Sequence, residues 1–226
     1  MKTSPTQPPW RAYLALAIGA LTLGFSAIFV RLADAPGAVS AFYRMSIATL
    51  MMTWPFLRAV KTKGRISSKG ARLAVWAGFF FAADLAAWMT GVVLSGATNP
   101  TLLANTAPLW VGLGAMLVFR EKLNLTFWTG LTLAFGGAIL ILGLDLARAA
   151  NLGLGSLYGL SAGVFYGIYL LFIQRTRENL DSLSSFWIAG FTSTIILLAL
   201  TIIFDQPLTG YSPFTYLNFL GMGLVN

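Results

Sequence analysis

The chain has 226 residues, of which 57% are hydrophobic and only 10% are charged. A soluble domain carries about 25% charged residues, so this composition excludes an ordinary soluble protein and indicates a membrane protein. The formal net charge of +8 does not indicate nucleic-acid binding, because the basic residues lie in short segments between long apolar runs. Cysteine and histidine are absent, so we predict no disulfide, no metal, no cofactor and no catalytic residue.

Apolar runs long enough to cross a bilayer recur along the chain, which predicts an all-α, polytopic fold. After a cytoplasmic tail at residues 1–11, we expect spans at 12–30, 38–56, 73–94, 98–119, 127–143, 154–173 and 186–204. A last apolar run starts at Phe214 and stops at Asn226. That run is too short to span, since a crossing needs about 20 residues. We therefore expect the native chain to continue past Asn226, with an interfacial helix as the alternative.

The distribution of basic residues predicts the orientation. Twelve of the 15 lysines and arginines fall in the tail and in alternate loops on one side: Lys2, Arg11, Arg58, Lys61, Lys63, Arg65, Lys69, Arg72, Arg120, Lys122, Arg175 and Arg177. Only Arg31 and Arg148 fall in loops on the other side, and Arg44 lies within a span. Because basic loops remain in the cytoplasm, we predict a multi-pass protein of the cytoplasmic (inner) membrane with a cytoplasmic amino terminus.

An internal repeat relates the first and sixth spans. Residues 24–31 (GFSAIFVR) align in register with 167–174 (GIYLLFIQ), and Phe42-Tyr43 falls on Phe186-Trp187 after one inserted residue. A repeat of five spans is odd, so its two copies enter the membrane in opposite senses. Inverted repeats are typical of transporters, whose substrate site lies near the midplane where the copies meet.

Several motifs carry a resemblance to a known family. They are DLAAW at 84–88, ATNPTLLANTAPL at 97–109, EKL at 121–123, the run from Gly130 to Gly143, Arg44, and GSLYG at 155–159. Together they resemble the EamA-type transporters of the drug/metabolite transporter superfamily, over essentially the whole chain. The resemblance implies a ten-span fold of two inverted five-helix repeats. The first EamA repeat covers 12–146, and the second covers 153–226 and is cut off in the eighth span.

The resemblance also implies a function. Such transporters move small metabolites, often amino acids, outward by rocking two halves about a central site. We therefore predict a secondary active exporter of small metabolites such as amino acids, not an enzyme, with a small-molecule substrate and the lipid bilayer as partners. A homodimer is left open, and nucleic acid is not expected. The alternatives are a truncated membrane protein that transports nothing and, without a supporting catalytic motif, a membrane-embedded enzyme.

Two charged residues lie inside the predicted spans, Arg44 and Asp84. Each costs roughly 2.5 to 3.5 kcal/mol at a helix centre on insertion scales. Two interpretations are open. The residues form a buried structural ion pair, or they line a cavity in which Arg44 meets a substrate carboxylate and Asp84 a substrate amine or a coupling proton. Trp88, one turn from Asp84 on the same face, is a further candidate for substrate binding.

The remaining candidates lie in the fourth and sixth spans. Asn105 either binds substrate or caps the backbone of a neighbouring helix, freed by Pro108. Tyr158 and Tyr169 belong to an aromatic stripe that either walls a cavity or packs against other helices. Beside that stripe, a glycine recurs at every fourth position, which predicts close helix packing. These helix-packing glycines are Gly155, Gly159, Gly163 and Gly167.

Overall fold

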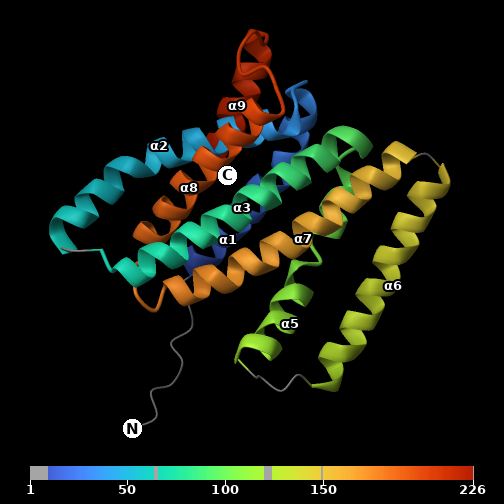
Figure 1. Ribbon diagram of the computed structural model, residues 1–226, viewed down its shortest axis with the longest axis horizontal. Helices are drawn as coiled ribbons and strands as arrows, with labels where there is room; N and C mark the ends of the chain where they lie inside the picture. Colours follow the sequence, from blue (N-terminus) through green and yellow to red (C-terminus); the bar gives the residue numbers. More distant parts are fainter. Residues whose placement is uncertain (1–9, 64–65, 120–123, 149, 226) are drawn as a thin grey trace.

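The computed structural model describes residues 10–63, 66–119, 124–148 and 150–225. Most of the predicted tail and the EKL motif therefore lie outside the described residues. Within the described part, the elements are all helices, which confirms the predicted class (Figure 1). They are α1 (Trp10–Leu32), α2 (Gly37–Lys63), α3 (Ser68–Ser95), α4 (Thr98–Ala104), α5 (Ala107–Phe119), α6 (Leu125–Arg148), α7 (Ala150–Thr176), α8 (Ser182–Ile203) and α9 (Pro213–Val225).

Three helices of the described chain are long and apolar enough to cross a membrane. They are Ser68–Ser95, Gly153–Thr176 and Ser182–Ile203. The segment Leu125–Ile141 of α6 is apolar but shorter. The carboxyl end of α2 extends past its apolar run into Arg58, Lys61 and Lys63, which are basic residues typical of a membrane boundary.

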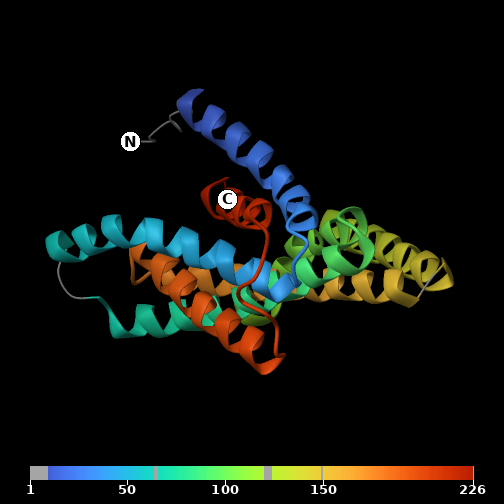
Figure 2. The same cartoon turned by 90° about the horizontal axis from the view of Figure 1, so that it is seen from above.

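The helix α3 lies at the centre of the arrangement. It packs along α7 on one side and against α8 and α2 on the other, so these four helices run side by side (Figure 1). The helices α4, α5 and α6 lie against α7. Figure 2 shows α1 leaving the main group of helices at an angle, with α9 beside it. The four central helices therefore supply most of the protein interior.

The predicted fourth span is two helices rather than one. The helix α4 ends at Ala104, and α5 begins at Ala107. Pro108 explains the break, because its ring would clash with the carbonyl four residues earlier and it has no N–H to donate there. In the first turn of α5 the missing N–H is harmless. The backbone freed at the break is partly satisfied locally, since Thr106 Oγ1 donates to the Leu103 carbonyl at 2.6 Å.

The four predicted packing glycines of α7 lie where neighbouring helices approach closely. A Cβ atom at Gly159 would lie 2.6 Å from the Pro100 carbonyl oxygen, and one at Gly163 would lie 2.9 Å from that of Leu103. Gly155 faces Ser95 and the Gly91 carbonyl, and Gly167 faces the Ala107 carbonyl and Trp110. Glycine therefore brings α7 against α3, α4 and α5 at a separation that no larger residue allows.

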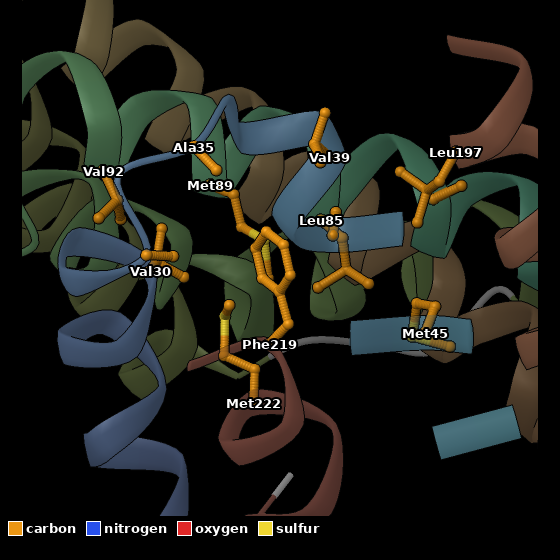
Figure 3. Close-up of a cluster of buried hydrophobic side chains, with 13 residues drawn as sticks. Val30, Ala35, Val39, Met45, Leu85, Met89, Val92, Leu197, Phe219 and Met222 are labelled. Carbon is orange, nitrogen blue, oxygen red and sulfur yellow. The ribbon is translucent and has the colours of Figure 1, made fainter. Parts of the chain in front are cut away.

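The main apolar core fills one end of this bundle. Its buried side chains come from the end of α1, the start of α2, the end of α3, and α8 and α9, and they include Val30, Val39, Met89, Val92, Leu197, Phe219 and Met222. Figure 3 shows Phe219 and Met222 pointing from α9 toward Met89 of α3. The short helix α9 thus closes the end of the bundle at which α3 finishes.

Candidate functional site

Asp84 and Arg44 lie together inside the bundle. Asp84 lies in the middle of α3 and is only 7% exposed, and Arg44 lies on the neighbouring α2 and is half-buried. The two side chains are close enough for a Coulombic attraction. Each of the two residues needs a partner of opposite charge, because burying an isolated charge in a membrane protein costs much free energy.

The helix α7 adds two tyrosines to this pair. Tyr166 interacts electrostatically with both Asp84 and Arg44, and Tyr169 interacts with Asp84. The two phenol rings stack with centroids 5.6 Å apart, and Tyr169 also stacks on Phe81 at 4.6 Å. The carboxylate, the guanidinium and two phenols from three helices therefore form one polar cluster within an aromatic wall.

A cavity of about 340 Å³ opens beside this cluster. Its lining comes from α2, α3, α7 and α8 and comprises Arg44, Met45, Ala48, Thr49, Met52, Phe81, Tyr169, Phe186, Ala189 and Gly190. Phe186 lies one turn into α8, and Tyr169 lies two turns before the end of α7. The cavity thus lies toward the end of the bundle where α7 finishes and α8 begins.

Hydroxyl groups hold α8 against α2 next to the cavity. Trp187 Nε1 donates to Thr53 Oγ1 at 3.0 Å, and the hydroxyls of Thr49 and Thr194 lie 3.5 Å apart. The Trp187 ring also stacks on Phe56 at 4.0 Å. These contacts keep polar atoms satisfied within an apolar region, and they fix the wall that Phe186 and Gly190 supply.

The opposite end of the bundle is closed by aromatic side chains and a loop. The Tyr43 ring stacks on Phe219 at 4.4 Å, and its hydroxyl donates to the Leu208 carbonyl at 2.6 Å. Leu208 belongs to the loop between α8 and α9, where burial raises the pKa of the Tyr211 phenol. The cavity is therefore separated from this end by the core cluster and by the loop bound to Tyr43.

Three of the sequence candidates lie elsewhere. Trp88 Nε1 donates to Thr101 Oγ1 at 3.1 Å and so links α3 to α4. Asn105 is exposed at the α4–α5 break, where its amide donates to the Thr101 carbonyl at 2.9 Å; it caps its own helix rather than a neighbouring one. It also lines a separate cavity of about 330 Å³ between α4–α5 and α6. Tyr158 is 42% exposed near the start of α7.

Several residues of the cavity, and Tyr166 of the polar cluster beside it, were not among the sequence candidates. Phe81 precedes Asp84 by three positions and Tyr166 precedes Tyr169 by three, so helical spacing could have identified both. Thr49, Met52 and Phe186 gave no such signal, because apolar and hydroxyl residues are common throughout the spans. Their role depends on how α8 packs against α2.

The geometry defines a helical membrane protein with a charged internal cavity, and the comparisons identify its family. The profile of the EamA-like transporter family matches residues 10–143, more than half of the chain. The chain therefore belongs to the EamA-like transporter family, which is a family of membrane transporters and not of enzymes. Among the curated proteins, none matches the sequence.

A solved structure shares the fold. It is described as "Crystal structure of protein", and it superimposes with a TM-score of 0.57 at 15% sequence identity, over 92% of this chain and 74% of that chain. At this identity the likeness concerns the fold alone. Family membership supplies the general function, which is passage of a small molecule across the membrane, and it confirms a multi-pass membrane protein.

Proposed function

We propose that this protein is a secondary active exporter that carries small metabolites, such as amino acids, across the cytoplasmic membrane by alternating access. The observation that carries the proposal is the cavity beside Arg44 and Asp84, which lies toward one end of the bundle, while apolar side chains and the loop bound to Tyr43 close the other. A transporter needs a central site that faces one side at a time, and this arrangement fits such a state.

The proposed architecture has two inverted repeats, at residues 12–146 and 153–226, within a ten-span fold. The family match ends at residue 143, close to the proposed end of the first repeat. The aligned segments 24–31 and 167–174 lie in α1 and α7, which would occupy equivalent places in the two repeats. With the amino terminus in the cytoplasm, α7 finishes and α8 begins on the cytoplasmic side, so the cavity faces the cytoplasm.

Within the cavity, we assign roles to the charged pair and the aromatic wall. Arg44 binds a substrate carboxylate, Asp84 binds a coupling proton or a substrate amine, and Tyr169 forms part of the wall. Trp88, one turn from Asp84 on α3, is a further proposed substrate contact. Asn105 and Tyr158 would contact substrate only in a conformation that brings α4 and the start of α7 toward the cavity. The glycines of α7 act in helix packing.

Flux through reconstituted liposomes tests the proposal. The purified protein is placed in liposomes loaded with amino acids and small organic acids, and efflux is followed by mass spectrometry with and without a pH gradient. We expect protein-dependent efflux that the gradient accelerates. Asp84→Asn should abolish the effect of pH, because the amide cannot exchange a proton in this range, whereas Asp34→Asn in the exposed α1–α2 turn should preserve it.

Two results would contradict the proposal. Unchanged pH dependence in Asp84→Asn would remove the proton role of Asp84. Absence of efflux for every solute, from a protein that remains folded, would instead favour a membrane protein that transports nothing.

A further inference from the structure

We infer that the cavity beside Arg44 takes an organic anion with a single carboxylate and one planar apolar body, such as an arylalkanoate, in preference to a zwitterion. The inference rests on the proposed transport function, and within the small metabolites proposed there it favours organic anions over the amino acids given as an example. It follows from the charge, the shape and the chemistry of the cavity lining.

The charge of the lining favours an anion. Among the described residues that line the cavity, Arg44 alone is charged. Asp84 is 7% exposed, does not line the cavity, and interacts with Arg44, Tyr166 and Tyr169. A substrate ammonium group would therefore enter an apolar cavity with no carboxylate on its wall, which carries a large desolvation penalty. A carboxylate would meet the Arg44 guanidinium, which is a rigid, planar donor suited to that group.

The apolar lining favours a flat ring. Phe81, Tyr169 and Phe186 supply aromatic faces and edges, and Met45 and Met52 supply flexible thioethers that pack well against rings. Gly190 allows α8 to approach α2 closely at the cavity wall. A Cβ atom there would lie 2.9 Å from Thr49 Oγ1 and 3.4 Å from the Met45 methyl carbon. The volume of about 340 Å³ lies at the lower end of the roughly 300 to 1,000 Å³ typical of ligand sites. The cavity thus suits one ring and a short chain.

Asp84 then acts as the counter-ion that substrate replaces. In this structure, Asp84 is the acidic partner of Arg44. The other titratable groups that face it, Tyr166 and Tyr169, come from α7, and the α8 sequence contains no titratable residue. A substrate carboxylate at Arg44 would add a second negative charge near Asp84, and the two would compete for one guanidinium. Neutralising Asp84 should therefore strengthen binding of an anion, whereas it should weaken binding of a zwitterion whose amine contacts Asp84.

Three probes with the same phenyl body separate these cases: 3-phenylpropanoate, phenylalanine and phenethylamine. Binding to the purified protein in lipid nanodiscs is measured by calorimetry. We expect 3-phenylpropanoate to bind at least about tenfold more tightly than phenylalanine, and phenethylamine not to bind. Arg44→Gln should weaken 3-phenylpropanoate binding by about tenfold or more. Arg44→Lys, which keeps the positive charge, should bind 3-phenylpropanoate more tightly than Arg44→Gln and less tightly than the original protein. Asp84→Asn should tighten 3-phenylpropanoate binding. Thermal unfolding of each variant shows that it remains folded.

The outcomes distinguish this inference from the proposed function. Tighter binding of phenylalanine than of 3-phenylpropanoate, or weaker 3-phenylpropanoate binding in Asp84→Asn, would overturn the anion assignment and leave the transporter intact. The same holds if none of the probes binds while liposomes still show protein-dependent efflux of another solute. If neither binding nor efflux occurs, the inference and the proposed function both fail.

Discussion

At the scale of single residues, we propose that Arg44 and Asp84 contribute more to function than to stability. Desolvation offsets most of the Coulombic attraction in a buried ion pair, so such pairs are weak sources of folding free energy. This pair nevertheless lies beside a cavity that could hold a ligand. The phenols of Tyr166 and Tyr169 also interact electrostatically with it. Exchange of one partner for a substrate group accounts for that placement better than stabilisation does.

A double substitution tests this interpretation. Replacing Arg44 alone by Met should destabilise the protein by about 3 to 5 kcal/mol, because it leaves an uncompensated buried carboxylate. Adding Asp84→Leu should restore stability to within about 1 kcal/mol of the original or above it. Reversible unfolding in mixed detergent micelles measures both, and efflux should be lost in both variants. If the double variant is as unstable as Arg44→Met alone, the ion pair itself stabilises the fold, and its role is structural.

At the scale of elements, helix type and approximate ends followed from the sequence, whereas helix continuity did not. The apolar run at 98–119 predicted one span, but α4 and α5 are separate helices. Pro108 was visible, yet many membrane helices continue through a proline because neighbouring groups satisfy the freed backbone. Whether a helix kinks or breaks there depends on tertiary contacts, here the approach of α7 through Gly159 and Gly163.

Alanine at two glycines tests the packing of these elements. Gly159→Ala should destabilise the protein by about 1 to 3 kcal/mol, since its methyl group would collide with Pro100 of α4. Gly136→Ala in α6 is the matched control, because beyond the adjacent backbone of its own helix no atom lies within 4 Å of its added Cβ, and alanine has the higher helix propensity. Unfolding midpoints in the same detergent compare them. Equal effects at both positions would contradict close packing at Gly159.

At the scale of the whole molecule, the two ends of the helix bundle differ. One end holds the cavity between α2, α3, α7 and α8. The core begins at the cavity wall, where Met45 belongs to both, and extends to the other end, where a loop accepts a hydrogen bond from Tyr43. Sequence reasoning singled out Arg44 and Asp84, because intramembrane charges are rare, and it left Tyr169 as either a cavity-wall or a packing residue. It could not place Phe186 or Thr49, since these meet only when α8 packs against α2. The orientation of the two ends in the membrane remains a prediction from loop charges.

Single cysteines test that orientation, and the absence of native cysteine makes each label unambiguous. Lys61→Cys marks the exposed end of α2, Thr209→Cys marks the exposed α8–α9 loop, and Thr49→Cys marks the cavity. In intact cells a membrane-impermeant maleimide should label Thr209→Cys only, because the basic end of α2 is predicted to be cytoplasmic. After permeabilisation Lys61→Cys should react, and Thr49→Cys should react more slowly from the same side. Labelling of Lys61→Cys in intact cells would reverse the predicted topology, and labelling of Thr49→Cys there would mean that the cavity faces outward.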